Sequence, residues 1–306
     1  MLIVVLNNES FKNVAVIVTF NKLNFLKKCL DGVLKSSDLL HKIVVVNNAS
    51  TDGTEQYLAD INRKNHQLVV INEMENLGGA AGFNRGIKEA MQLKADAVWV
   101  MDDDTIPTRE TLVALIAARQ NVQAEFNSWG VLASNVRWTD GSAALMNVPQ
   151  SGKPWNQSKN SNLITIDSSS FVSMYINAIA VKRLGLPISD FFIWGDDVEF
   201  SHRISTQYPS FCVTDSHVLH KMAQNQKVDI LTDDKKRVPR YFYDVRNKMY
   251  MAKKQGFRAR MRYGIHFCAV IVRVLFTSQY KMLKVFTMFK GLFAGIVFNP
   301  KIEKLN

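Results

Sequence analysis

The first 135 residues alternate between short apolar runs and longer segments with helical periodicity. The apolar runs are bounded by polar turns and have the length of buried strands. They cover 14–20, 43–46, 68–71, 97–101 and 131–136. The segments between them predict helices at about 22–35, 54–64, 80–93 and 109–120. Such alternation predicts an α/β fold, a mostly parallel sheet with helices on both faces.

The polar residues that stand out follow the ends of these predicted strands. They lie in 19–21, 47–54, 76–86 and 102–104. Ligands of parallel α/β sheets bind at the carboxyl ends of the strands, so we expect a binding site there. Further along, 139–162 is rich in Ser, Asn, Gly, Pro and Lys and predicts a long loop, and a short strand is predicted at 211–214.

Three adjacent carboxylates, Asp102, Asp103 and Asp104, directly follow an apolar predicted strand. Neighbouring carboxylates repel one another, and a bound cation would explain them. Alternate residues of an extended chain point the same way, so Asp102 and Asp104 can share a site while Asp103 faces elsewhere. Mg²⁺ and Mn²⁺ suit carboxylates and diphosphate oxygens, and they neutralise a phosphate leaving group. The alternative is a solvated acidic turn.

A second acidic cluster, with Asp196, Asp197 and Glu199, follows the apolar segment 191–194. These acids are therefore expected at a pocket wall, where a carboxylate can act as a general base. Trp194 could stack on the apolar face of a sugar ring. The alternative is a helix N-terminus, which acidic side chains cap and stabilise.

His220 lies 23 residues after Asp197. A histidine near two carboxylates suits Mn²⁺ as a third ligand. A lone histidine is more often structural, however, and His217 is a nearby competitor.

Charge is distributed unevenly over the chain, whose formal net charge is +11. Residues 235–306 hold 17 Lys or Arg and two acids, whereas the rest of the chain holds 21 basic and 25 acidic residues, a net charge of −4. A segment this basic suits nucleic acid, anionic lipid or an acidic partner. We expect no nucleic acid, because its aromatic and cationic residues form neither a stacking platform nor a recognition helix.

From residue 257 onward, apolar and basic residues are mixed, and the charges interrupt every run that could span a membrane. Arg273, Thr277, Lys281 and Lys284 follow spacings of four, four and three, which predicts one polar helical face. This favours an amphipathic helix in the plane of an anionic membrane surface. An ordinary helix that packs on the main domain is the alternative.

The three cysteines (Cys29, Cys212 and Cys268) form no zinc pattern and suggest no disulfide framework. A reducing compartment is their natural setting. The apolar residues 1–6 are too few for a signal peptide. We therefore expect a cytoplasmic protein at the inner face of the cell membrane.

Four segments resemble the inverting family-2 glycosyltransferases, which have the GT-A fold: 14–21, 44–54, 76–86 and the Asp triplet 102–104. The resemblance covers roughly 13–250. The Asp triplet and the segment 194–199 are most similar to bacterial galactofuranosyl- and rhamnosyltransferases of cell-surface polysaccharide synthesis. Residues 243–247 are similar to a segment of the same subgroup, without an assigned role.

The resemblance implies that Asp102, Asp104 and His220 hold Mn²⁺ or Mg²⁺. It implies that Asp197 is the catalytic base, with Asp196 beside it, and that Trp194 and Glu199 contact the acceptor. The residues implied along the donor nucleotide are Thr19, Asn21, Asn47, Asn48, Asp52, Asn76, Gly78, Gly79, Arg85, Asp102 and Asp103. Asn47 stands where many relatives have an aspartate that reads the base, so the preference between uracil and thymine stays open.

The predicted organisation is a GT-A domain over 1–256, with a nucleotide-binding half at 1–136 and an acceptor-binding half at 137–256. A basic, amphipathic helical tail follows at 257–306. The predicted donors are UDP-galactofuranose first and dTDP-rhamnose second, and the predicted acceptor is lipid-linked or an oligosaccharide. The rival functions are a metal-dependent nucleotidyltransferase or nucleotide-sugar hydrolase, and a nucleic-acid-binding protein.

Overall fold

The computed structural model describes residues 11–221 and 224–305, so the apolar residues 1–6 lie outside the described residues. In the first half the strands are β1 (Asn13–Thr19), β2 (Lys42–Asn47), β3 (Leu68–Asn72), β4 (Ala97–Asp102), β5 (Thr105–Ile106) and β6 (Val131–Arg137). The helices of this half are α1 (Leu23–Leu34), α2 (Thr54–Asn62), α3 (Gly78–Gln92) and α4 (Arg109–Phe126).

The second half of the chain contributes strands to the same sheet and most of the remaining helices. Its strands are β7 (Gln150–Ser151), β8 (Leu163–Ser168), β9 (Met174–Asn177) and β10 (Phe211–His220). Its helices are α5 (Ala178–Leu184), α6 (Asp196–Ser205), α7 (Tyr241–Lys254), α8 (Phe257–Thr277) and α9 (Lys281–Val297).

All five strands and four helices expected in the first 135 residues are present, and 139–162 is mostly irregular as predicted. The strand predicted at 211–214 is longer than expected. It pairs in parallel with β6 on both sides of a register shift between Val213 and His217. The polar residues at this irregularity conceal the continuation of the strand in the sequence, and the continuation carries His220 to the site.

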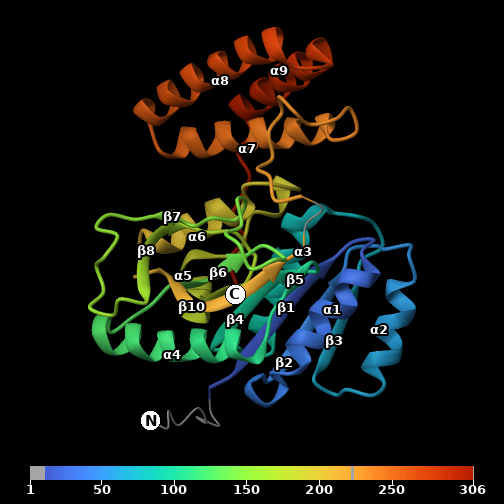
Figure 1. Cartoon of the computed structure of the whole chain (residues 1–306), viewed down its shortest axis with the longest axis vertical. Helices are drawn as coiled ribbons and strands as arrows, with labels where there is room; N and C mark the ends of the chain where they lie inside the picture. The colour runs from blue at the N-terminus through green and yellow to red at the C-terminus, as the bar shows by residue number, and fades with distance from the viewer. Residues whose placement is uncertain (1–10, 222–223, 306) are drawn as a thin grey trace.

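The sheet has the strand order β3-β2-β1-β4-β9-β6-β10-β8-β7, with β5 paired to β10 (Figure 1). β1, β2, β3 and β4 are parallel, whereas β9 runs antiparallel between β4 and β6. Alternate residues of β1 enter two different cores. Ile17 belongs to the core that includes residues of α1 and α4, and Val16 belongs to the core that includes residues of α3 and α6. The predicted α/β fold with helices on both faces is confirmed.

Helix α3 lies unusually close to β1, because two of its glycines face the strand. A Cβ atom on Gly82 would be 2.6 Å from a methyl group of Val18, and one on Gly86 would be 2.4 Å from Val16. The absence of side chains at these positions allows the close approach. The N-terminus of α3 thereby reaches the edge of the sheet where the polar loops gather.

Helices α7, α8 and α9 form a separate layer beside the sheet body, with α7 nearest to the body (Figure 1). Their shared core includes Tyr241, Phe267 and Met288. Helix α9 approaches α7 through Gly291, where a Cβ atom would be 2.6 Å from the carbonyl oxygen of Phe242. We call residues 241–297 the helical unit. It includes α7, which the sequence-based division at 256 groups with the body.

The single polar face predicted for the tail is wrong. The chain leaves helical geometry at Ser278 and Tyr280, so Arg273 and Lys281 lie on different helices. Lys284 is fully buried, and its Nζ donates to Ser278 Oγ at 2.7 Å and to Leu231 O at 3.3 Å. Among the described residues, no helix is both long enough and apolar enough to cross a membrane.

The chain returns to the body after α9. Glu303 forms an ion pair with Lys88 of α3 at 2.6 Å, and its carbonyl oxygen accepts a hydrogen bond from the backbone of Leu186. The residues that follow α9 at the end of the predicted tail are therefore packed on the body.

Candidate active site

Asp102 is the last residue of β4, at the carboxyl end of the parallel strands. Within the described part of the chain its carboxylate forms no hydrogen bond or ion pair, although the residue is only partly exposed. Burial and the neighbouring charge of Asp104 raise the pKa of Asp102 to about 7. A buried carboxylate without a partner is costly, and a cation would remove that cost.

Asp103 accepts hydrogen bonds from the end of β1 and from the turn that follows it. Its Oδ2 accepts hydrogen bonds from Thr19 Oγ1 at 2.8 Å and from the backbone of Phe20 at 3.3 Å. Burial raises the pKa of Asp103 to about 6, although the charge of Lys22 opposes the shift. The expectation that Asp103 faces away from Asp104 is wrong. The chain turns from β4 into β5 after Asp102, and Asp103 and Asp104 both contact Lys22.

His220 reaches Asp104 because β5 and β10 pair in antiparallel fashion, with His220 opposite Thr105. His220 Nε2 lies 3.0 Å from Asp104 Oδ1. Burial would raise the pKa of Asp104, but the hydrogen bond to His220 and the charge of Lys22 outweigh it and lower this pKa to about 2. His217, the competitor, is exposed, so the structure brings His220 and not His217 to the acidic triplet.

Lys22 is a site residue that the sequence analysis missed. Its Nζ lies 2.7 Å from Asp104 Oδ2 and 3.4 Å from Asp103 Oδ1. Burial works to lower the pKa of Lys22, but these two carboxylates outweigh it and raise the pKa. The available signal was a cation three residues after Thr19, within the loop predicted to hold the nucleotide.

Asp196 and Asp197 are the first two residues of α6, as the helix-terminus alternative predicted. Burial raises the pKa of Asp197 to about 6, and its Oδ1 accepts a hydrogen bond from the backbone of Val198. Burial and the charge of Asp197 raise the pKa of Asp196 well above its usual value, and the charge of Asp102 adds to this effect. Screening limits the reach of a charge to about 10 Å, so the end of β4 lies near the start of α6.

The loop before α6 has an unusual backbone and is held by α7. Phe192, Trp194 and Gly195 all have positive φ angles, of 63°, 65° and 88°. The buried Asn247 side chain donates from Nδ2 to the carbonyl oxygens of Phe191, Ile193 and Trp194 at 3.0, 3.2 and 2.8 Å. Arg246 donates to Asn247 Oδ1 and to two carbonyls of the same loop. This contact gives the segment 243–247 a structural role.

The same loop also contacts the glycine-rich start of α3. The backbone of Ala80 donates to Phe192 O at 3.1 Å. A Cβ atom on Gly78, whose φ is 84°, would lie 2.2 Å from that carbonyl oxygen, whereas one on Gly79 would meet no atom within 4 Å. The predicted nucleotide segment and the loop before α6 are thus in direct contact.

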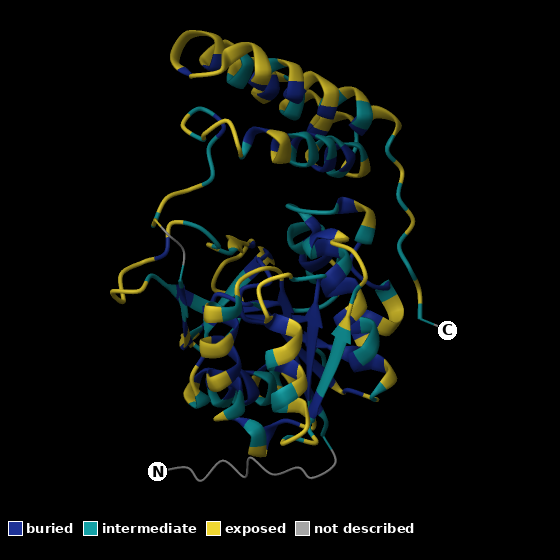
Figure 2. Cartoon of the chain, turned by 90° about the vertical axis from the view of Figure 1, so that its right-hand side faces the viewer, coloured by how far each residue is buried: buried dark blue, intermediate teal, exposed yellow. Residues whose placement is uncertain are grey.

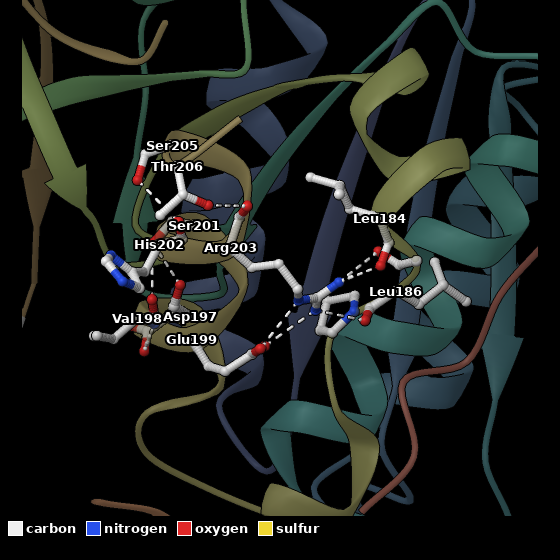
Figure 3. Close-up of polar contacts among 12 residues, drawn as sticks. Leu184, Leu186, Asp197, Val198, Glu199, Ser201, His202, Arg203, Ser205 and Thr206 are labelled. Atoms are coloured by element: carbon white, nitrogen blue, oxygen red, sulfur yellow. Dashed lines mark hydrogen bonds and ion pairs between the residues drawn. The ribbon is translucent and has the colours of Figure 1, made fainter. Parts of the chain in front are cut away.

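Glu199, predicted to contact the acceptor, forms an ion pair with Arg203 on the next turn of α6 (Figure 3). Arg203 Nε and Nη2 donate to the two carboxylate oxygens, each at 3.0 Å. The guanidinium also donates to the carbonyls of Leu184 and Leu186 (Figure 3). The pair therefore ties α6 to the segment after α5, and an acceptor role for Glu199 stays a prediction.

The remaining predicted donor residues connect the loops at the edge of the sheet. Asn21 accepts a hydrogen bond from the backbone of Thr51, and Asp52 accepts one from that of Leu23. Asn48 donates to Asn76 Oδ1, Asn47 donates to Asn72 Oδ1, and Arg85 lies 3.6 Å from Glu73. A cavity of about 360 Å³ opens beside them and is lined by Ser50, Thr51, Gly53, Glu55, Gln56 and Ala59. Trp194 packs against Tyr241, with ring centroids 5.3 Å apart.

Residues 14–171 match the family model described as "Glycosyl transferase family 2", which covers more than half of the chain. The chain belongs to glycosyl transferase family 2. Among curated proteins, this family-2 glycosyltransferase is 26% identical over 279 residues to galactofuranosyltransferase GlfT1 of Mycolicibacterium smegmatis, covering 83% of the chain and 88% of the relative. It is 27% identical over 262 residues to GlfT1 of Mycobacterium tuberculosis, covering 80% and 83%.

Solved structures share the GT-A fold of this glycosyltransferase. The mannosyltransferase PcManGT of Pyrobaculum calidifontis, in complex with GDP-Man and Mn²⁺, aligns with a TM-score of 0.54 at 15% identity, over 94% of this chain and 87% of that one. GalNAc-T7 with UDP, GalNAc and Mn²⁺ aligns with a TM-score of 0.57 at 15% identity, over 82% and 53%. At these identities the likeness establishes the fold alone.

The side chains at the end of β4 are of the types that bind a divalent cation, but they are not arranged as a complete metal site. Among the residues that the structure describes, no three His, Cys, Asp or Glu side chains have the spacing of a metal site. The Asp102 carboxylate nevertheless lacks a partner there, and the buried His220 Nδ1 has no hydrogen bond. Carboxylate oxygens and an imidazole nitrogen form a donor set that Mn²⁺ accepts. The positive charge of Lys22 lies at the edge of this set.

Proposed function

We propose that this glycosyltransferase transfers a sugar from a nucleoside diphosphate to an acceptor hydroxyl, in one displacement that inverts the anomeric configuration. The proposal is carried by the placement of two acidic groups: Asp102 ends β4 at the carboxyl edge of the parallel strands, and Asp196 begins α6, near enough for the charge of Asp102 to add to the raised pKa of Asp196. One group suits the binding of a diphosphate through a cation, and the other suits the removal of a proton from the acceptor.

Asp197 takes the proton from the acceptor hydroxyl, since a carboxylate with a pKa of about 6 is ionised at neutral pH and still a useful base. Asp196, whose pKa is raised well above its usual value, can remain protonated and donate a hydrogen bond beside it. Asp102, Asp104 and His220 would hold Mn²⁺ or Mg²⁺, which would supply positive charge for the departing diphosphate. Lys22 adds a positive charge on the same side.

The donor is UDP-galactofuranose as first choice, because the GlfT1 relatives are galactofuranosyltransferases. The second choice is dTDP-rhamnose. The nucleotide binds along the loops of residues 1–136, and the acceptor, a lipid-linked or other oligosaccharide, binds along 137–256. We further propose that the enzyme works in cell-surface polysaccharide synthesis, on the cytoplasmic side of the membrane. Thermal stabilisation by a panel of nucleotide sugars with Mn²⁺ would identify the donor.

Asp197→Asn tests the proposed base. Transfer should fall by about 10²–10⁴-fold, the usual contribution of a general base, while the affinity for UDP stays within about twofold. Asp140→Asn, at an exposed turn, is the matched control and should retain full activity. Wild-type turnover in Asp197→Asn would overturn the assignment.

Asp104→Ala tests the proposed cation site separately. Calorimetric titration with UDP should show the Mn²⁺-dependent part of the affinity in the wild type and lose it in the variant. The rival enzyme functions differ in their products. A hydrolase would release free sugar without an acceptor product, whereas a transferase forms one glycosylated acceptor for each nucleoside diphosphate released.

A further inference from the structure

Helices α8 and α9 each have two apolar faces on nearly opposite sides. The inner faces are buried in the helical unit and include Phe267 and Val274 of α8 and Met288 and Gly291 of α9. A helix that packs on a soluble body needs only one apolar face. The second face of each helix is therefore the feature that needs an explanation.

The outer face of α8 carries an apolar stripe with regular helical spacing: Phe257, Met261, Ile265, Cys268, Val272 and Phe276. Intervals of three and four residues place these side chains in one line along the helix. Phe257 and Ile265 are each 68% exposed, and Phe276 is 80% exposed. In Figure 2 this outer surface of the helical unit is largely exposed.

Helix α9 repeats the arrangement with Met282, Phe286, Phe289, Phe293 and Val297. Phe286 is 69% exposed and Phe293 is 64% exposed. Together with the α8 residues they form what we call the outer face. Large apolar side chains gathered in this way on a surface indicate a binding site.

The charges on these helices indicate what the outer face binds. Between residues 257 and 297 there are seven Lys or Arg residues and no Asp or Glu. Helical periodicity places Arg258, Arg262 and Arg273 along one edge of the α8 stripe, and Lys290 lies beside the α9 stripe. Two copies of such a face would repel each other, whereas an anionic lipid surface would attract it.

A hollow at the turn between α8 and α9 combines basic and apolar side chains, as a lipid-binding site would. Its volume is about 620 Å³, and it is lined by Lys235, Ser278, Tyr280, Lys281, Met282 and Leu283. Lys235 and Lys281 are exposed. The nearby acid Asp233 is already bound to Arg237 and to the hydroxyl of Tyr241. Among the residues that the structure describes, neither lysine has an ion-pair partner, and two such cations beside apolar side chains suit the phosphate group and upper acyl chain of a lipid.

We propose that the outer face of α8 and α9 docks the enzyme on an anionic membrane, with both helices lying in the plane of the surface. The apolar stripes enter the boundary between headgroups and acyl chains, and the flanking cations bind lipid phosphates. Helix α7 lies between this face and the body (Figure 1). The loop before α6, which α7 holds, would then lie within one or two helix diameters of the membrane, about 10–20 Å.

Co-sedimentation of the full-length protein with vesicles tests the proposal. We expect binding to vesicles of phosphatidylcholine mixed with phosphatidylglycerol, weaker binding to phosphatidylcholine alone, and a decrease with salt. Ile265→Gln, Phe286→Gln and Phe293→Gln combined should weaken binding at least tenfold. Arg258→Glu, Arg262→Glu and Arg273→Glu combined should abolish the preference for anionic vesicles. The matched control is Met74→Gln, which replaces a side chain that is 97% exposed on the body.

Cys268 provides a second readout, since it is exposed on the α8 stripe while Cys29 is buried. In a Cys212→Ser background, an environment-sensitive dye on Cys268 should shift to the blue when anionic vesicles are added. The proposal is overturned if the wild type stays in the supernatant with every vesicle. It is also overturned if light scattering shows a dimer that the Gln variant dissociates, because a second copy would then cover the face. Neither result would affect the proposed transferase chemistry, which a soluble acceptor measures.

Discussion

The body and the helical unit place their charges and apolar side chains in opposite ways. The body buries its apolar residues in two cores and carries carboxylates at the end of β4 and at the start of α6, where burial raises the pKa of Asp102 and Asp197. The helical unit leaves a row of apolar side chains in solvent and carries no acid in α8 or α9. Both regions thus carry groups that folding alone does not require: partly buried carboxylates in the body, and exposed apolar side chains in the helical unit. The proposals above assign the first to catalysis and the second to membrane binding.

The two regions meet at the loop before α6. Asn247 of α7 holds this loop from one side, and Gly78 of α3 contacts it from the other. The geometry of Asp197 therefore depends on both regions. Variants of the residues that contact the loop from α3 and from α7 measure how strongly the position of Asp197 depends on each region.

Gly78→Ala should give the largest effect. The new Cβ would lie 2.2 Å from Phe192 O, at a φ of 84° that L-residues rarely adopt. Strain and overpacking together should lower the free energy of unfolding by about 3–5 kcal/mol, or displace the loop and abolish transfer. Thermal unfolding and activity measure both.

The neighbouring variant Gly79→Ala is a close control, because a Cβ there meets no atom within 4 Å. It should leave stability within about 0.5 kcal/mol of the wild type. If Gly79→Ala raises KM for the donor, the predicted nucleotide contact at this position gains support. Equal behaviour of the two variants would contradict the close contact between α3 and the loop before α6.

Asn247→Leu removes the donor that holds three loop carbonyls while keeping the size of the side chain. We expect kcat to fall about 10²-fold, because small misplacement of a catalytic group is costly, with little change in KM for the donor. The pH–rate profile should shift as well, since Asp197 leaves its environment. Lys248→Met, an exposed neighbour on α7, is the control. An unchanged profile with lowered Tm would assign Asn247 a purely structural role.

The elements of the body could be predicted because each depends on local pattern. Apolar runs and helical spacing are visible along the chain, and the acids stand next to strands that identify them as loop residues. The interactions missed are long-range. Lys22 meets Asp104 across 82 residues, and Asn247 meets the loop before α6 across 53–56 residues. The periodicity of a sequence gives no information about contacts between residues so far apart in the chain.

The tail shows why composition and residue spacing were insufficient to predict which side chains are exposed. Spacing placed Lys284 on a polar face, but a break at Ser278–Tyr280 turns α9 back and buries this lysine against Leu231 O. Both α8 and α9 pack on α7, and such long-range contacts are not visible in the spacing of residues along the chain. The tail does form basic helices with apolar faces, as expected. The prediction of which residues form the polar face was wrong.

The charge of Asp197 should cost stability above pH 6. Its pKa is raised from 3.8 to about 6, so the folded state binds the proton more tightly than the unfolded state does. The stability that the protonated form contributes is complete below about pH 4 and lost as pH rises through about 6. Asp197→Asn should therefore be more stable than the wild type by about 1–3 kcal/mol at pH 7.5, and equal to it near pH 4. Urea unfolding at both pH values measures the difference, and a constant difference would contradict the shifted pKa.

Glu199→Gln should give the smallest effect and decides between two roles for this residue. Both oxygens of Glu199 are bound by Arg203, and the two side chains are only 13% and 14% exposed. Glutamine keeps one acceptor oxygen and loses the charge, so the free energy of unfolding should fall by about 1 kcal/mol while KM for the acceptor is unchanged. Asp244→Asn, in the more exposed pair with Lys248 on the helical unit, should cost less than about 0.5 kcal/mol. If instead Glu199→Gln raises KM for the acceptor about tenfold at unchanged stability, the ion pair opens when acceptor binds. Glu199 would then belong to the acceptor site, as the family resemblance implies, and α6 would supply both the base and the groups that orient its substrate.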